Sequence, residues 1–213
     1  GIGIKIFEGH LDVKSNVPTW TNYPRNSFET LRTGIIMRAD SADYVSGFIY
    51  NSDFSDCSAH AIYVNSTGAE SLYAADCKVN QIQNNYNLFF SSLPSTPPTA
   101  YNGITVIGDG RNQINNCTFN ANFDEYFTSF RNIQLLFDGS ILTGGSYSDI
   151  FSNTFRQACN NGVSLQLYGQ SGHVHVDYNT FMPSPSPLGS VTNPDWGLGV
   201  VNSYDVNVTN NSF

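Results

Sequence analysis

Charged residues are scarce in this 213-residue chain, and lysine, which occurs three times, is the rarest of them. Leucine is also scarce, whereas asparagine and serine, which favour turns over helix interiors, are abundant. These proportions exclude an α-helical bundle. Nine lysines and arginines oppose 17 aspartates and glutamates, so the formal net charge is −8. A nucleic-acid-binding surface requires a basic stripe, which this composition does not provide, and we predict no nucleic-acid partner.

Long hydrophobic runs and paired cysteine motifs are absent as well. No apolar stretch approaches the roughly 18 residues of a membrane-spanning helix, and no secretory signal peptide is visible. The four cysteines are too few for a disulfide scaffold, and they lack the CxxC spacing of a zinc site. We therefore predict no membrane insertion, no metal and no other cofactor.

His173 and His175 are two residues apart, which puts them on one face of a strand. Such a pair could bind a metal ion, but no third histidine and no obvious carboxylate ligand lie nearby in the sequence. We therefore interpret them as two exposed histidines of a strand.

Aromatic and small polar residues are abundant. Phenylalanine, tyrosine and tryptophan make up 14% of the chain, and asparagine, serine and threonine account for 64 residues. So many aromatic residues can support a hydrophobic core, which argues against intrinsic disorder. The length fits one domain, and we assign residues 1–213 to it. Because the chain is strand-like from Gly1 onwards, we interpret it as a fragment of a longer protein.

Internal repetition is the most informative feature of the sequence. Short segments that end in phenylalanine recur along the chain, and apolar residues alternate with polar residues ahead of them. Such alternation is typical of a β-strand. The phenylalanines in question are Phe54, Phe119, Phe155, Phe181 and Phe213.

A second set of strand-like segments lies between the first, and most of them begin with glycine followed by isoleucine or valine. The two sets alternate along the chain in a repeat with a core of about 25 residues and variable insertions. The aligned apolar positions of the second set are Ile4, Ile35, Ile62, Ile104, Ile133, Val163 and Val200.

This repeat predicts an all-β fold, a right-handed parallel β-helix that forms a single solenoid of about seven coils. Equivalent residues then stack at the strand spacing of about 4.8 Å, so the phenyl rings form an internal ladder. Small or amide side chains two positions before each ladder residue can stack beside the rings. They are Ser52, Cys77, Cys117, Asn153, Asn179 and Asn211. We expect Cys77 and Cys117 to be neighbouring reduced thiols.

Four long insertions follow the phenylalanine strands, at residues 18–33, 80–102, 120–131 and 182–197. Equivalent connections of a solenoid stack along one edge, so we expect all four insertions on one side. Insertions confined to one face often mark a binding surface. Their aromatic rings can stack on sugars, while polar side chains bond the hydroxyl groups. The alternative is that these aromatic residues pack the loops onto the solenoid or are buried between subunits.

The Asn-x-Phe endings at 153–155, 179–181 and 211–213, with glycine-isoleucine strands between them, resemble the right-handed β-helix proteins of the phage tailspike and pectin lyase type. The resemblance covers essentially the whole chain, but it is one of architecture and includes no catalytic motif. It implies a homotrimeric adhesin of the virion tail, or an otherwise extracellular protein. Its expected partners are a bacterial surface polysaccharide and other virion tail proteins. Tailspikes of this kind often cleave the polysaccharide as well.

The candidate site residues come from the four insertions. Glycoside hydrolysis uses two carboxyl groups roughly 5–9.5 Å apart. The candidate catalytic carboxylates are Glu29, Asp124, Glu125 and Asp195. The candidate carbohydrate-binding residues are Trp20, Tyr23, Arg25, Tyr86, Tyr126, Arg131 and Trp196. A lyase would instead need a basic proton acceptor, for which the candidates are Arg25, Arg32, Arg111 and Arg131.

Three functions remain open. The preferred one is a tailspike-like receptor-binding protein that recognises a host polysaccharide; if it is an enzyme, it is a depolymerase, with hydrolysis favoured over elimination. The second is a secreted lyase or hydrolase of the pectin-degrading type. The third is a structural adhesin or shaft segment without catalysis.

Overall fold

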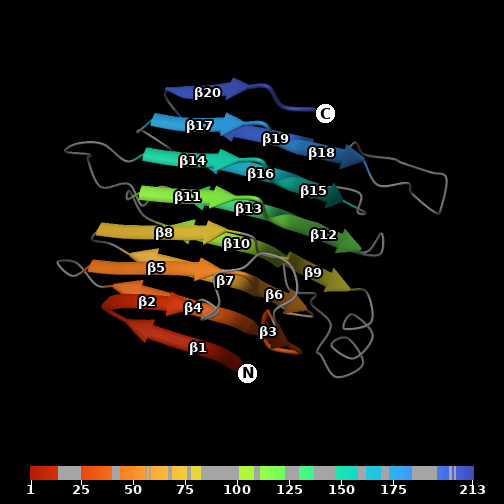
Figure 1. The fold of residues 1–213 in the computed structure, drawn as a ribbon. Helices are drawn as coiled ribbons and strands as arrows, with labels where there is room; N and C mark the ends of the chain where they lie inside the picture. Colours follow the sequence, from red (N-terminus) through yellow and green to blue (C-terminus); the bar gives the residue numbers. More distant parts are fainter. Residues whose placement is uncertain are drawn as a thin grey trace, which may run out of the picture.

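The computed structural model describes residues 1–13, 25–39, 44–55, 57, 59–66, 69–75, 78–82, 101–107, 111–122, 130–136, 147–157, 162–168, 173–183, 196–201, 203 and 205–213. Within these ranges the chain has twenty strands and no helix (Figure 1). The prediction of an all-β fold is therefore confirmed. A helix long and apolar enough to cross a membrane does not occur in the described residues.

The strands form three parallel sheets, and every third strand along the chain joins the same sheet. The first sheet contains, in order, β1 (Ile2–Phe7), β4 (Thr33–Ala39), β7 (His60–Ser66), β10 (Tyr101–Ile107), β13 (Phe130–Leu136), β16 (Gly162–Tyr168) and β19 (Trp196–Val201). The second contains β2 (Gly9–Val13), β5 (Tyr44–Tyr50), β8 (Ala69–Ala75), β11 (Arg111–Asn115), β14 (Tyr147–Phe151), β17 (His173–Asp177) and β20 (Val206–Thr209). The third contains β3 (Asn26–Glu29), β6 (Ser52–Ser55), β9 (Lys78–Ile82), β12 (Thr118–Asn122), β15 (Thr154–Gln157) and β18 (Thr180–Pro183). The two termini lie at opposite ends of the stacked strands (Figure 1).

Each repeat therefore has three strands, whereas the sequence indicated two. The segment that ends in phenylalanine is divided between the second and third sheets by a sharp corner. One residue at this corner has a left-handed conformation, with φ between 50 and 55°, which asparagine adopts more readily than most residues. The alternation of apolar and polar residues continues across the corner, so the sequence pattern does not show where one strand ends and the next begins. The corner residues are Asn51, Asn116, Ser152, Tyr178 and Asn210.

We had expected all four insertions to leave from one corner of the repeat, but they do not. Residues 83–100, 123–129 and 184–195 each connect a strand of the third sheet to the next strand of the first sheet. Residues 14–24 instead connect β2 to β3, which is the passage from the second sheet to the third. The expectation was wrong for this first insertion because Phe28 lies on a third-sheet strand that we had included in the insertion.

Phenyl rings stack through the interior of the third sheet. Consecutive rings have centroids 4.8–5.1 Å apart in two series, Phe28–Phe54 and Phe119–Phe155–Phe181–Phe213. The register places Val79 between Phe54 and Phe119. Phe213 stacks on Phe181 but is 70% exposed, because no ring follows it. The predicted ladder is confirmed, and Phe28 is an additional member.

Glycine at the start of the first-sheet strands makes room for these rings. A Cβ atom on Gly34 would lie 2.7 Å from a ring carbon of Phe54 and 2.7 Å from the carbonyl oxygen of Ala61. A Cβ atom on Gly197 would lie 3.0 Å from the ring of Phe213. The two sequence motifs, glycine-isoleucine and Asn-x-Phe, are thus two sides of one packing contact.

Asparagine side chains form a second ladder beside the rings. Nδ2 of Asn153 donates to Oδ1 of Asn179 at 3.0 Å, and Nδ2 of Asn179 donates to Oδ1 of Asn211 at 3.0 Å. Each Oδ1 also accepts a main-chain N–H from the preceding repeat, as Asn153 does from Cys117. The buried amides of the ladder are therefore hydrogen-bonded, and they favour one register of the repeats.

The two cysteines that we expected to be neighbours cannot be compared. Cys117 is a buried thiol, whereas Cys77 lies outside the described residues.

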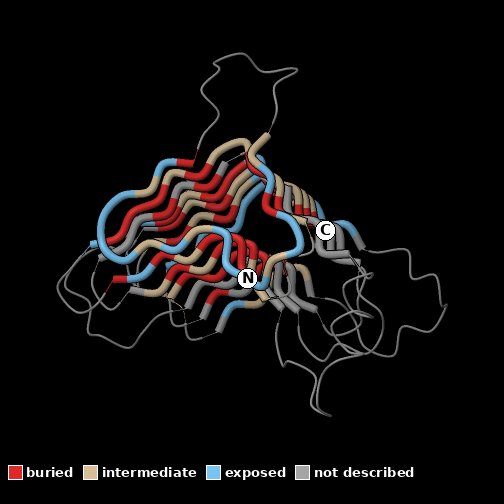
Figure 2. Tube along the Cα trace, turned by 90° about the horizontal axis from the view of Figure 1, so that it is seen from below, coloured by how far each residue is buried: buried red, intermediate tan, exposed pale blue. Residues whose placement is uncertain are grey.

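Aliphatic side chains complete the interior, where buried positions recur from strand to strand (Figure 2). Our alignment of the first-sheet strands was wrong by two residues in the last two repeats. Leu165 and Leu198, not Val163 and Val200, continue the row that starts at Ile4. The alternation of a strand has a period of two residues, so alternation alone could not reveal a register error of two residues.

Candidate functional site

Of the predicted carboxylate and carbohydrate-binding residues, the structure describes the side chains of two, Glu29 and Arg25. Arg131 and Trp196 are described in their main chain, as members of β13 and β19. The other predicted site residues lie outside the described residues: Trp20, Tyr23, Tyr86, Asp124, Glu125, Tyr126 and Asp195.

Glu29 belongs to β3 and not to a loop. It is exposed at the end of the strand, where its Oε1 accepts a hydrogen bond of 2.6 Å from the hydroxyl of Ser27. The three carboxylates that could complete a catalytic pair with Glu29 lie outside the described residues. The carboxylate pair therefore stays a prediction.

The guanidinium group of Arg25 makes contacts within the fold. Its Nε donates to Oδ1 of Asp53 at 2.5 Å, and its Nη1 donates to Oδ1 of Asn51 at 2.7 Å. These bonds fasten the residue that precedes β3 to the corner that leads into β6. They give Arg25 a structural role, and its binding of carbohydrate stays a prediction.

Arg131 and Trp196 share one row of residues across the first sheet. The row consists of the first or second residue of each strand, and we call it the first-sheet row: Ile2, Thr33, His60, Asn102, Arg131, Val163 and Trp196. Neighbouring strands lie about 4.8 Å apart, so the main chains of Arg131 and Trp196, two strand spacings apart, are separated by about 10 Å. The connections 83–100, 123–129 and 184–195 all end next to this row.

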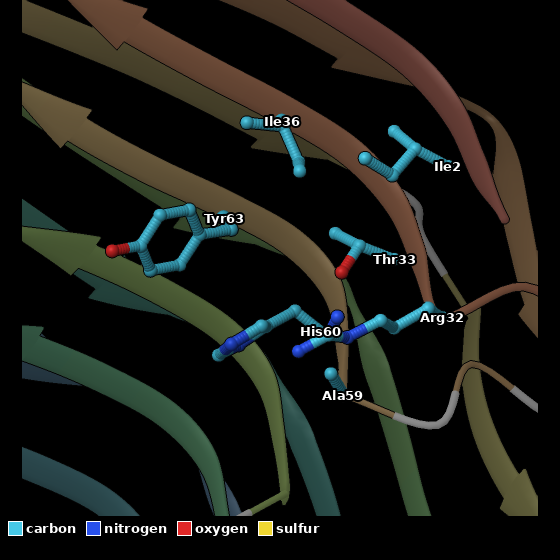
Figure 3. A pocket seen from close by; sticks show the side chains of 7 residues that line it. All are labelled: Ile2, Arg32, Thr33, Ile36, Ala59, His60 and Tyr63. Atoms are coloured by element: carbon cyan, nitrogen blue, oxygen red, sulfur yellow. The ribbon is translucent and has the colours of Figure 1, made fainter.

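A cavity of about 200 Å³ lies at the N-terminal end of the first-sheet row (Figure 3). Three members of the row contribute to its wall, together with residues just before β4 and β7 and along those strands. The lining residues are Ile2, Arg32, Thr33, Ile36, Ala59, His60 and Tyr63. Ile2 and Ile36 make one side apolar, and the side chain of Arg32 extends toward His60 on the other (Figure 3).

His60 is the titratable group most affected by this environment. Burial, and to a smaller extent the positive charge of Arg32, lower the pKa of His60 to about 4. The imidazole is therefore neutral at pH 7. Its Nδ1 lies 3.3 Å from the hydroxyl of Thr105, and its ring centroid lies 4.9 Å from that of Tyr63. A neutral imidazole can donate a hydrogen bond from one nitrogen and accept one at the other.

Sequence reasoning did not find this cavity. Of its residues it had named Arg32, as one of several candidate bases for a lyase. Ile2, Thr33 and His60 are about 30 residues apart in the sequence, and the strand pairing brings them into one row. No local motif marks them, so the exact register would have been needed to group them.

A second group of ionisable side chains lies on the second sheet, around His173 and His175. Nδ1 of His173 contacts the carboxylate of Asp205, and Nδ1 of His175 lies 3.5 Å from Oδ1 of Asp149. The Nε2 atoms of the two imidazoles are 2.8 Å apart, so one donates and the other accepts. Both histidines are partly exposed, and the sequence did not reveal their carboxylate neighbours because these come from other repeats. Among the described residues, no three histidine, cysteine, aspartate or glutamate side chains form a group that could hold a metal ion.

The cavity and the histidine group differ in their relation to the insertions. The cavity is part of the row next to which three insertions end, whereas the histidine group lies on β17 of the second sheet. The first-sheet row is therefore the better candidate for a functional surface.

Comparisons with models of protein families, with curated proteins and with solved structures gave no match for this chain.

Proposed function

We propose that this chain is a right-handed parallel β-helix that binds a bacterial surface polysaccharide along its first-sheet row, in the manner of a phage tailspike. The observation that carries the proposal is the convergence of three insertions on this row, next to Asn102, Arg131 and Trp196. Two of these three residues are of the types that stack on sugars or bind their polar groups most strongly.

The β-helix part of the proposal is supported by the strand order. Each strand reaches its neighbour in the same sheet only after the chain has passed through the two other sheets. A chain that repeats this passage winds around a single axis. Crossover connections between parallel strands are right-handed in about 98% of cases, which favours that hand here.

A polysaccharide suits the first-sheet row because both are elongated and repetitive. Seven strands at a spacing of about 4.8 Å give the row a length of roughly 29 Å. Arg131 lies on this row and Arg32 lies directly before Thr33, in a chain that has only nine lysines and arginines. The row thus combines an aromatic residue, amide and hydroxyl groups, and a share of the few positive charges.

The proposal extends to cleavage of the polysaccharide and to assembly of the protein. Hydrolysis would use a pair from Glu29, Asp124, Glu125 and Asp195, and the protein would then be a depolymerase. The homotrimer, its place on the virion tail and its contacts with other tail proteins follow from the resemblance alone.

Titration calorimetry with host surface polysaccharides tests the proposal. The Arg131→Ala and Trp196→Ala changes together should weaken binding at least tenfold, because each removes about 1 kcal/mol or more. Asn207→Ala, on an exposed position of the second sheet, is the matched control and should bind like the parent. Equal binding by all three proteins would place the site elsewhere, and binding to no surface polysaccharide would refute the function.

A further inference from the structure

Arg32 differs from Arg25 in having no acidic partner among the residues that the structure describes. Among the residues that the structure describes, no carboxylate forms an ion pair with Arg32, whereas Arg25 is paired with Asp53. The Arg32 side chain is exposed and lines the cavity. Its guanidinium group is thus available to an anion that enters from solvent.

The cavity has a positive charge although the chain as a whole is negative. No aspartate or glutamate is among the described residues that line it, and Arg32 supplies the charge. His60 adds none at pH 7, because its pKa is about 4. In a chain with a net charge of −8, this is a local departure that favours an anionic ligand.

The remaining wall suits a sugar ring. Ile2, Ile36 and the ring of Tyr63 offer apolar and aromatic contacts, and the polar atoms of Thr33 and His60 can bond hydroxyl groups. Pockets for drug-sized ligands measure roughly 300–1,000 Å³. The present cavity, at about 200 Å³, is the size for a single ring.

We propose that this cavity is a subsite for a carboxylate-bearing sugar, in which Arg32 pairs with the carboxylate while Ile36 and Tyr63 contact the ring. This inference rests on the proposed function and adds to it that the recognised polysaccharide is acidic. The planar guanidinium group matches a carboxylate in a two-bond geometry, which a phosphate ion shares but a neutral sugar does not. Arg131 lies three strands from Thr33 along the row, about 14 Å away, where it can meet a second acidic unit.

The histidine resonances of the protein report on this cavity directly. Proton NMR can follow the ring signals during titration with glucuronate, and His60→Asn identifies the His60 signal by its loss. Glucuronate should shift the His60 signal and raise its pKa from about 4, because a nearby anion favours the charged imidazole. Glucose should leave the signal in place, and inorganic phosphate at equal ionic strength should move it less than glucuronate does.

Two arginine variants assign the effect to one side chain. Arg32→Gln should abolish the response to glucuronate. Arg32→Lys keeps the positive charge but not the planar group that forms two parallel hydrogen bonds, so it should retain part of the response. Arg38→Gln is the matched control, because Arg38 is exposed on β4, the strand that directly follows Arg32, but lies outside the cavity, near the ring of Phe7. An unchanged response in Arg32→Gln, or an equal response to glucose or phosphate, would overturn the inference.

A pair of ligands separates the subsite from the proposed function. One is an oligosaccharide that contains uronic acid, and the other is the same oligosaccharide after reduction of its carboxyl groups. We expect the acidic form to bind about tenfold more tightly, and Arg32→Gln to remove this difference. Equal binding of both forms by the parent would refute the subsite and leave the function standing. Binding of neither form, with the glucuronate response of His60 intact, would refute the function and leave the subsite standing.

Discussion

The interior of the third sheet and the first-sheet row belong to the same repeat but differ in how much their residues vary. The interior has phenylalanine and asparagine at equivalent positions in successive repeats, with centroid distances near 5 Å between the rings. The row has a different residue in every repeat, from Ile2 to Trp196. Stacking favours like residues because each one packs against its own equivalent. Recognition of a ligand imposes no such identity, so variation within a regular repeat marks the surface that is available for function.

Removal of a ring from the middle of the ladder should have the largest effect on stability. Phe155→Ala should lower the free energy of unfolding by about 3–5 kcal/mol, because Phe155 is fully buried between two rings. Thermal and denaturant unfolding measure the loss. Phe7→Ala is the control, since Phe7 is about half exposed and should cost much less. Equal losses in the two variants would show that the ladder does not stabilise the fold.

The amide ladder should be nearly as sensitive. Asn179→Ala removes the acceptor for the N–H and the Nδ2 of Asn153, and also the donor to the carbonyl of Ile150. Leaving such groups buried without partners should cost about 2–3 kcal/mol by denaturant unfolding. Asn207→Ala, an exposed change on the second sheet, should stay within about 0.5 kcal/mol of the parent. A neutral Asn179→Ala would mean that the rings alone set the register.

The stability of the protein should depend on pH through His60, a member of the first-sheet row. The folded-state pKa of His60 is about 4, below the ordinary value of 6.5, so the unfolded chain binds the extra proton first as pH falls. His60 thus contributes full stability above pH 6.5, and this is lost as pH falls toward 4. The loss should be on the order of 2 kcal/mol, less than the full shift implies because the ring is partly exposed.

His60→Asn should flatten this part of the curve, whereas Arg38→Gln should leave it unchanged. Unfolding measured at several pH values between 4 and 7 gives the comparison. A parent protein whose stability does not change over this range would contradict the burial of the imidazole. Such a result would also weaken the case for the cavity, since His60 forms part of its wall.

The interior could be predicted from the sequence because its residues repeat. The five phenylalanines and the asparagines of the ladder were identified from spacing alone. Phe28 was missed because it lies on a four-residue strand with one buried side chain, which gives too little alternation to detect. The slip from Leu165 to Val163 is one of two residues, and the period-2 alternation of a strand does not distinguish registers that differ by two.

The candidate site could be predicted only in part, for a related reason. Arg131 and Trp196 were identified by residue type and insertion, but their membership of one row depends on strand pairing. Ile2 and His60 come together in the cavity from different repeats, and no pattern of residues in the sequence indicates this. The same applies to Asp149 and Asp205 beside the two histidines. A varying surface gives no repeat to align.

Hydrogen–deuterium exchange with and without host polysaccharide tests the central claim most directly, because it needs no variant and reports on all three sheets at once. If the first-sheet row binds the polysaccharide, the ligand should slow exchange at the starts of β4, β7, β10, β13 and β19. Exchange in β14, β17 and β20 of the second sheet should not change. Protection centred on the second sheet, or none in the presence of bound polysaccharide, would contradict the proposal.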